Sequence, residues 1–272
     1  MPARHRSILL LLASLGSLAF GQKIDYRLVG TAKIEERLHA VDKDNNKRRH
    51  KIIELFKEAG CGENHLSEEP RNASWGNVVC TLPGSESSTI VVGAHFDHVP
   101  AGLGVIDNWT GASMLPSLLE SLSSKPRKHT FVFIAFAEEE KGLVGSRHYV
   151  GHASSEELQR IHAMIAMDSL GLGITEVWVS RSDLGLMKKL DAVADMLKVP
   201  VRGMNVEKIG TTDSEPFSKK KIPTITFHSL TQETLNVLHT ADDDFPVLKP
   251  AQYYQSYALL AAYLAYLDVT LE

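Results

Sequence analysis

The 272-residue chain lacks the features that mark several large protein classes. It has only two cysteines, too few and wrongly spaced for a zinc finger. Its formal net charge of −4 provides no basic surface for nucleic acid, so we expect no nucleic-acid partner. It has no internal repeat and no low-complexity tract, which argues against a repeat protein.

Common catalytic motifs are also absent. The serine-hydrolase pattern G-x-S-x-G is missing, because Gly111-Ala112-Ser113-Met114-Leu115 lacks the second glycine. The metalloprotease motif H-E-x-x-H, the phosphate loop and the dinucleotide fingerprint are missing as well. Any enzymatic activity must therefore depend on another arrangement of side chains.

Long hydrophobic runs are scarce. Ile8 to Phe20 is apolar but too short to span a bilayer, and it follows a basic start. The small residues in Ala19-Phe20-Gly21 precede a cleavage point at Gln22, so residues 1–21 predict a secretory signal peptide. We therefore expect the mature chain, 22–272, to be exported (periplasmic or secreted) and to have no membrane segment. An uncleaved anchor or a helix of the fold is the alternative interpretation.

In an exported protein, the pair Cys61 and Cys80 is a candidate disulfide. Cys61 follows an expected helix, and Cys80 lies towards the end of an expected strand. Contact between them is therefore sterically reasonable. Two buried free thiols are the alternative interpretation.

The chain has 43% hydrophobic and 23% charged residues, a composition typical of a globular protein with a sizeable core. Strand-like apolar runs alternate with helical patterns, and no linker divides the chain. This predicts a single α/β domain with a central, mostly parallel mixed sheet and helices on both faces. Strands are expected at 76–82, 89–94, 129–137, 161–167, 175–180, 201–206 and 223–227. Helices are expected within 26–59, 114–122, 142–150, 184–197 and 250–267, with 42–49 as a solvated polar loop or helix break.

Two of the expected central strands end abruptly in polar residues. Val91 to Ala94 runs into His95, and Phe131 to Ala137 runs into three consecutive glutamates. In open α/β sheets, ligands bind just beyond the carboxyl ends of the strands, so these side chains should meet in one crevice. Later segments around Asp168 and His239 offer further ligand types.

Imidazole nitrogens and carboxylate oxygens are zinc ligands, and a pair of metal ions needs a bridging carboxylate. Two dications facing three carboxylates leave one net positive charge, which a bridging hydroxide cancels. The sequence therefore predicts a site for two zinc ions. The candidate ligands are His95, Asp107, Glu140, Asp168 and His239.

Two further acidic residues lie beside these candidates. Asp97 is two residues after His95, so its carboxylate is expected to accept the second ring N–H of that histidine. Glu139, next to Glu140, is expected to be the general base that takes a proton from metal-bound water. We interpret the other histidines near the strands as ordinary residues of the fold. They are His98, His129, His148, His162 and His228.

The motifs follow one another in a recognisable order. They are His95-Phe96-Asp97, Asp107-Asn108-Trp109-Thr110-Gly111, Glu139-Glu140-Lys141-Gly142-Leu143-Val144-Gly145-Ser146, Asp168-Ser169-Leu170-Gly171 and His239-Thr240. This order resembles the co-catalytic di-zinc aminopeptidases, peptidase family twenty-eight of the metallo class, which are related to glutaminyl cyclases. The resemblance implies a zinc-dependent exopeptidase domain over 22–272 with a phosphorylase/hydrolase-like fold. A metal-bound hydroxide would hydrolyse the N-terminal bond of peptides with a free N-terminus.

The resemblance also implies individual roles. His95 and Asp168 would bind one zinc ion, and Glu140 and His239 would bind the other. Asp107 would bridge the two ions.

Outside the ligand set, the resemblance implies a substrate-binding position at Asp213, although Ser214 stands where the family usually has histidine. Asp243 matches an acidic position of the family, and Ile106 departs from it, because many members have aspartate there. A glutaminyl-peptide cyclotransferase with one zinc ion is the alternative function, but cyclases usually have serine at Asn108. A binding protein with a degenerate site is a third possibility, which the complete ligand set disfavours.

Overall fold

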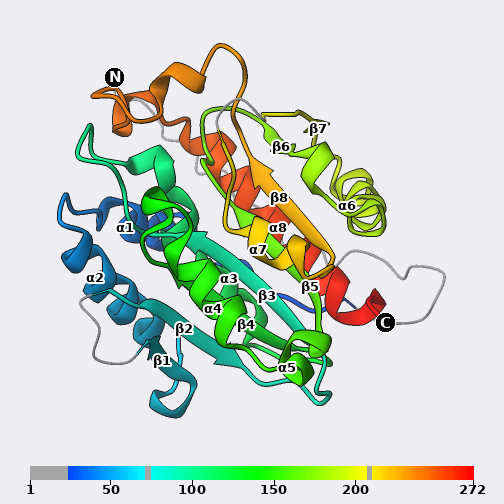
Figure 1. The fold of residues 1–272 in the computed structure, drawn as a ribbon. Coiled ribbons are helices and arrows are strands. Elements are labelled where there is room, and N and C mark those ends of the chain that lie inside the picture. Colours follow the sequence, from blue (N-terminus) through cyan, green and yellow to red (C-terminus); the bar gives the residue numbers. More distant parts are fainter. Residues whose placement is uncertain (1–23, 71–74, 207–209) are drawn as a thin grey trace, which may run out of the picture.

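The computed structural model describes residues 24–70, 75–206 and 210–272. The expected signal peptide and its cleavage point lie outside the described residues. The described residues form a mixed eight-stranded sheet with helices on both faces, as predicted (Figure 1). The strands are β1 (Leu66–Glu69), β2 (Asn77–Leu82), β3 (Thr89–His95), β4 (Thr130–Phe136), β5 (Ile161–Met167), β6 (Thr175–Val177), β7 (Val201–Gly203) and β8 (Thr224–His228). The helices are α1 (Thr31–His39), α2 (Asn45–Glu58), α3 (Thr110–Leu122), α4 (Val144–His152), α5 (Ser155–Arg160), α6 (Leu184–Leu197), α7 (Ser214–Lys219) and α8 (Pro250–Thr270).

The strand order is β1-β2-β4-β3-β5-β8-β6-β7. The four middle strands, β4, β3, β5 and β8, are parallel, while β2 pairs antiparallel with β4 and β6 pairs antiparallel with β8. The carboxyl ends of the four parallel strands therefore lie along one edge of the sheet. That edge is where the predicted site residues should gather.

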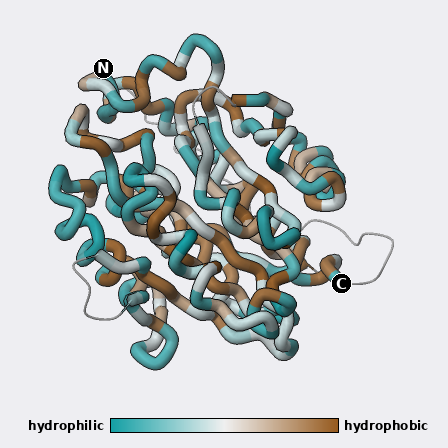
Figure 2. Tube along the Cα trace, viewed as in Figure 1, coloured by the Kyte–Doolittle hydropathy of each residue, from teal (hydrophilic) through white to brown (hydrophobic). Residues whose placement is uncertain are grey.

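The core is divided by the sheet because successive strand side chains point to opposite faces. Ile90 and Val92 of β3 pack in the cluster that α1, α2, α3, α6 and α8 cover, while Val91 packs in the cluster that α4, α5 and α7 cover. Strands buried on both faces read as continuous apolar runs, which is why the central strands were predictable. Figure 2 shows these hydrophobic segments in the middle of the molecule and hydrophilic residues in the outer loops.

Several elements differ from the sequence-based expectation. The expected strand at 175–180 ends at Val177, because the following residues form a turn in which Ser182 N donates to Val179 O. Strand β1 was not predicted, since its four residues lie half-exposed at the sheet edge and lack an apolar alternation. The short helices α5 and α7 were missed because six residues are too few to show a helical period.

The helical region expected within 26–59 is divided into α1 and α2. Asp44 caps α2, where its side chain accepts hydrogen bonds from Asn46 N and Lys47 N. The expectation of a solvated polar loop or helix break at 42–49 holds only as far as Asp44, because α2 begins at Asn45 and Arg48 is completely buried. Among the helices of the described residues, none combines the length and apolar character needed to cross a membrane.

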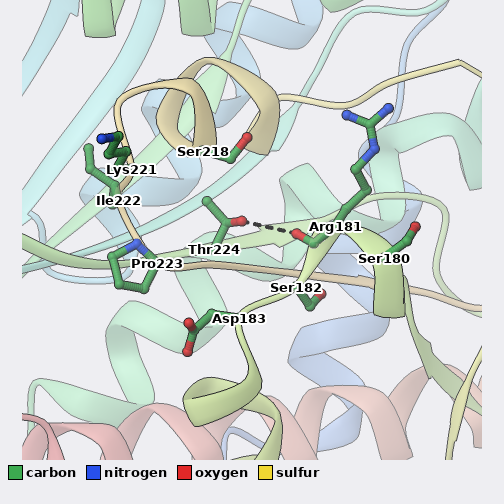
Figure 3. Close-up of a pocket in the computed structure, with 9 residues that line it drawn as sticks. All are labelled: Ser180, Arg181, Ser182, Asp183, Ser218, Lys221, Ile222, Pro223 and Thr224. Carbon is green, nitrogen blue, oxygen red and sulfur yellow. Dashed lines mark hydrogen bonds between the residues drawn. The ribbon is translucent and has the colours of Figure 1, made fainter.

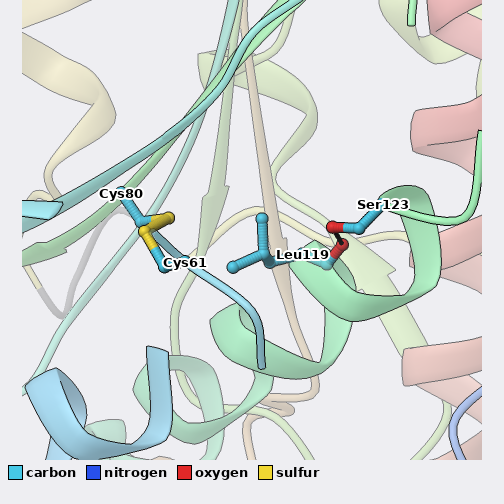
Figure 4. The surroundings of a disulfide bond; sticks show 4 residues. All are labelled: Cys61, Cys80, Leu119 and Ser123. Atoms are coloured by element: carbon cyan, nitrogen blue, oxygen red, sulfur yellow. Dashed lines mark hydrogen bonds between the residues drawn. A yellow bond between two sulfur atoms is a disulfide. The ribbon is translucent and has the colours of Figure 1, made fainter. Parts of the chain in front are cut away.

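A disulfide joins Cys61, which follows α2, to Cys80 of β2, with their Cα atoms 6.2 Å apart (Figure 4). Both cysteines are buried in the hydrophobic cluster that also contains Leu119 of α3. The bond therefore ties α2, which lies early in the chain, to the antiparallel edge of the sheet.

We predict that this disulfide stabilises the protein chiefly by restricting the unfolded chain. The two cysteines are 19 residues apart, so a Cys61→Ser/Cys80→Ser double variant should lower the free energy of unfolding by about 3 kcal/mol. Urea denaturation of both proteins measures this difference. Thiol titration of the denatured, unreduced protein should find no free thiol, and two reactive thiols would contradict the bond.

Candidate metal centre

The five predicted ligands converge at the carboxyl edge of the parallel strands. His95 is the last residue of β3, and Asp168 follows β5 directly. Asp107 lies in the turn Val105–Trp109 before α3, and Glu140 lies in the turn Glu139–Lys141 after β4. His239 comes from the loop between β8 and α8. Four separate connections thus bring side chains to one place.

Asp107 lies between the two histidines. Its Oδ1 is 3.2 Å from His95 Nε2, and its Oδ2 is 3.2 Å from His239 Nε2. Each imidazole has a second carboxylate beside it: Asp168 Oδ1 is 3.6 Å from His95 Nε2, and Glu140 Oε2 is 3.0 Å from His239 Nε2. The structure thus has two half-sites of one histidine and one carboxylate each, with Asp107 shared.

This donor set fits a pair of divalent cations. Ligand atoms of His95, Asp107 and Glu140 all lie within 4.8 Å of one another. Glu140 Oε1 is buried and has no hydrogen-bond partner among the described residues, which costs free energy unless a cation or donor satisfies it. Two imidazoles and three carboxylates are ligands of the kind that zinc takes at catalytic sites.

The pKa values of the candidate ligands also indicate a site that favours bound cations. Burial lowers the pKa of His95, but the carboxylates of Asp107 and Asp168 outweigh burial and raise it well above its ordinary value. The hydrogen bond to Asp107, together with the charge of Glu140, raises the pKa of His239 to about 9. Burial raises the pKa of Glu140 to about 7. Bound metal ions would take the place of these protons.

Asp97 acts differently from the prediction. His95 Nδ1 lies 3.1 Å from the main-chain oxygen of Asp97 and 3.7 Å from its carboxylate. The carboxylate instead accepts hydrogen bonds from the main-chain N–H groups of Glu139, at 3.0 Å, and Glu140, at 3.3 Å. The first N–H groups of a helical turn have no partner within the turn, so they compete well for a nearby carboxylate. Asp97 thus orients the ring through its main chain and the glutamate turn through its side chain.

Glu139, which is partly buried, and Asp213, which is buried, are two further carboxyl groups beside the ligands. Burial raises the pKa of Glu139 to about 10, and the nearby charge of Asp213 acts in the same direction. Burial likewise raises the pKa of Asp213 to about 7. Asp213 is 2% exposed at the start of α7. Bound metal ions beside these groups would lower both pKa values again and favour the ionised carboxylates.

Two asparagines that position the ligand turns were not singled out as such from the sequence. Asn108 is completely buried, and its Nδ2 donates to Met167 O while its Oδ1 accepts from Ser169 N. Asn77 Nδ2 donates to Gly145 O, and its Oδ1 accepts from Ala137 N. A Cβ at Gly145 would lie 2.2 Å from Asn77 Oδ1, so only glycine allows this approach. The signal in the sequence that could have identified them was an asparagine within an apolar segment, where its side chain is expected to be buried.

A pocket of about 540 Å³ lies elsewhere, beside the start of β8 (Figure 3). Two of its polar groups are engaged within the protein: Thr224 Oγ1 donates to Arg181 O, and Asp183 Oδ1 accepts from Leu186 N. It lies at the opposite end of β8 from the ligands. We therefore place the functional site at the carboxyl edge of the sheet rather than in this pocket.

A model of one protein family, described as Peptidase family M28, matches residues 77–264. The chain belongs to peptidase family M28. The resemblance drawn from the motifs is confirmed by this match. The M28 model covers both asparagines and all five candidate ligands, but not α1 or α2.

Individual M28 relatives are longer than this chain. Aminopeptidase YwaD of Bacillus subtilis is 30% identical over 185 residues, which are 64% of this chain and 40% of that protein. The solved structure of a zinc aminopeptidase from Bacillus subtilis has a TM-score of 0.64 at 25% identity, covering 70% of this chain and 49% of its own. The chain thus spans less than half the length of these relatives.

A glutaminyl cyclase from an Acidobacteriales bacterium shares the fold over a larger share of its length. Its TM-score is 0.75 at 16% identity, and the match covers 93% of this chain and 99% of the cyclase. At this identity the match establishes the fold alone.

We predict that Asn77 is a structural anchor of the glutamate turn. Asn77→Ala would leave the buried Ala137 N–H without its partner and remove a hydrogen bond to Gly145 O, and should lower the free energy of unfolding by about 3 kcal/mol. Asn46→Ala, at an exposed site on α2, should change it by less than about 0.5 kcal/mol. Urea denaturation compares the two, and equal effects would rule out the anchoring role.

Proposed function

We propose that the protein is a zinc-dependent aminopeptidase that hydrolyses the first peptide bond of peptides with a free α-amine. The observation that carries this proposal is the shared position of Asp107, 3.2 Å from an imidazole on each side. Membership of family M28 and the names of its relatives support it. His95 and Asp168 would hold one zinc ion, Glu140 and His239 the other, and Asp107 both.

Bound zinc ions would supply the Lewis-acid chemistry: they polarise the scissile carbonyl and lower the pKa of water. Glu139 would take the proton of the attacking water and deliver it to the leaving nitrogen. A general base must be held steadily near the reacting atoms. The hydrogen bond from Glu139 N to Asp97 meets that need, because it fixes the turn on which the base stands.

The acidic surroundings favour a substrate with a positive end. Glu139 and Asp213 add two carboxyl groups to the three of the ligand set, and no arginine lies within the matched motifs. A free α-ammonium group is therefore accepted more readily than a C-terminal carboxylate. We also propose export of the chain from Gln22 onward, which the disulfide supports because such bonds persist in oxidising compartments. Mass measurement of the mature N-terminus checks that cleavage point.

A second candidate function is glutaminyl-peptide cyclisation with one zinc ion. The observation that favours it is the length of the structural match. The match covers 99% of the glutaminyl cyclase, but only 49% of the zinc aminopeptidase. Asn108 weighs against it, because the buried amide bridges Met167 O and Ser169 N, and a serine side chain is too short to do so.

We predict opposite effects for the two adjacent glutamates. Glu139→Gln should keep close to two zinc equivalents and the fold but lose on the order of 10²–10⁴-fold in kcat, because it removes the base. Glu140→Gln should lose metal, because it removes a ligand. Metal analysis after removal of loose ions, circular dichroism and kinetics separate the two. The reverse pattern would shift the assignment by one residue, and one tight equivalent in the wild type would favour the cyclase.

We predict cleavage of free-amine substrates only. Aminoacyl-4-nitroanilides should be hydrolysed, whereas their N-acetylated counterparts should resist, because acetylation removes the ammonium group that the acidic site receives. A zinc chelator should abolish the activity. Equal cleavage of the acetylated compounds would refute the aminopeptidase proposal. Cyclisation of glutaminyl peptides without hydrolysis would assign the protein to the second function.

A further inference from the structure

Arg48 of α2 is a completely buried arginine whose guanidinium is bonded to main-chain oxygens. Its Nε donates to Asp42 O at 2.7 Å, its Nη1 to Phe96 O at 2.9 Å, and its Nη2 to Gly104 O at 3.1 Å and to Leu103 O. No ion pair to Arg48 is found in the described part of the chain. Burying an arginine is costly, so its retention needs a reason.

Three of the four oxygens that accept these hydrogen bonds, those of Phe96, Leu103 and Gly104, belong to the two segments that carry metal-ligand candidates. Phe96 follows His95 directly, and Gly104 lies three residues before Asp107. Trp109, two residues after Asp107, lies with its ring under the guanidinium, 5.5 Å from the ring centre. One planar group thus holds the end of β3 and the Asp107 loop at a set separation.

The loop is shaped for this contact. Gly104 has φ +60°, a left-handed conformation that favours glycine. A Cβ there would lie 3.0 Å from Arg48 Nη2 and 2.5 Å from His98 Cβ. Any side chain at this position would push the loop away from the arginine.

A buried carboxylate holds the same loop from its other side. Asp243 Oδ1 accepts from Ile106 N at 2.7 Å, and Oδ2 accepts from Asp107 N at 3.2 Å. Burial lowers the pKa of Arg48 to about 10, and the charge of Asp243 opposes that shift. Arg48 is therefore a cation at neutral pH, and the loop lies between opposite charges.

We propose that Arg48 is a positioning residue that holds the bridging carboxylate of Asp107 between the two half-sites. The inference rests on the proposed two-zinc site. It concerns a residue outside the segment that the family model matches. A lysine at this position would keep the charge, but its single nitrogen cannot donate to four oxygens in the plane of a guanidinium.

The test is zinc affinity, measured by competition with a chromophoric chelator on the full-length, metal-free protein. Arg48→Lys should weaken zinc binding about 10–100-fold, the usual cost of losing a residue that orients a metal ligand. It should lower kcat and leave KM nearly unchanged. Arg127→Lys is the matched control, because Arg127 is 5% exposed and donates to the main-chain oxygens of Leu122 and Lys125, remote from the ligands.

Equal zinc affinity in Arg48→Lys and the wild type would overturn the inference and leave the proposed function standing. An equal loss in Arg127→Lys would also overturn it, because the effect would then be general destabilisation. A wild-type protein that binds no zinc would overturn the proposed function itself. If Arg48→Lys does not fold, Gly104→Ala decides: it keeps the arginine but displaces the loop, so it should weaken zinc binding, and unchanged binding refutes the role.

Discussion

The sharing of Asp107 between two imidazoles is the arrangement on which the rest of the site depends. It requires five ionisable side chains from four connections to lie within a few ångströms of one another, and two of them, His95 and Asp107, are buried. Such a cluster is unfavourable unless cations or hydrogen bonds compensate it. The protein therefore needs a framework that holds the ligands in place before any metal binds, and the sheet supplies its base, because the carboxyl ends of the parallel strands fix where each connection begins.

The framework is completed by buried polar side chains that bind main-chain atoms. Asn77 fixes the glutamate turn to the end of β4, Asn108 joins the Asp107 turn to the end of β5, and Asp97 joins the end of β3 to Glu139 and Glu140. Asn108 and Asp97 each join two segments that carry candidate ligands or the candidate base, while Asn77 holds both ends of the glutamate turn. A turn held only by its own hydrogen bonds could shift independently, whereas these cross-links make the position of each ligand depend on its neighbours.

The predictable part of this structure was the part encoded by local pattern. Strands β3 and β5 are continuous apolar runs, and α6 has the length its amphipathic period predicts. The ligand types were readable because His95 and Asp168 directly follow such runs. Arg48 was not readable, because it lies in a charged stretch and its partners are main-chain oxygens some 50 residues later, which leave no trace in residue type. The carboxylate of Asp97 was misplaced for the same reason: its preferred donors are N–H groups of a turn 42 residues away.

Main-chain hydrogen bonds also explain how the site tolerates Ile106, where many members of the family have aspartate. The side chain of Ile106 is buried in a hydrophobic cluster with Leu172, Trp178 and Leu230, away from any ionic role. Its main-chain N–H, however, donates to Asp243, and the next N–H, that of Asp107, donates to the same carboxylate. The loop is therefore held by its backbone, between Asp243 and Arg48, and the residue beside the carboxylate that we propose as the bridge is free to contribute packing instead of charge. An apolar residue in place of a carboxylate beside the candidate ligands thus leaves the position of Asp107 intact.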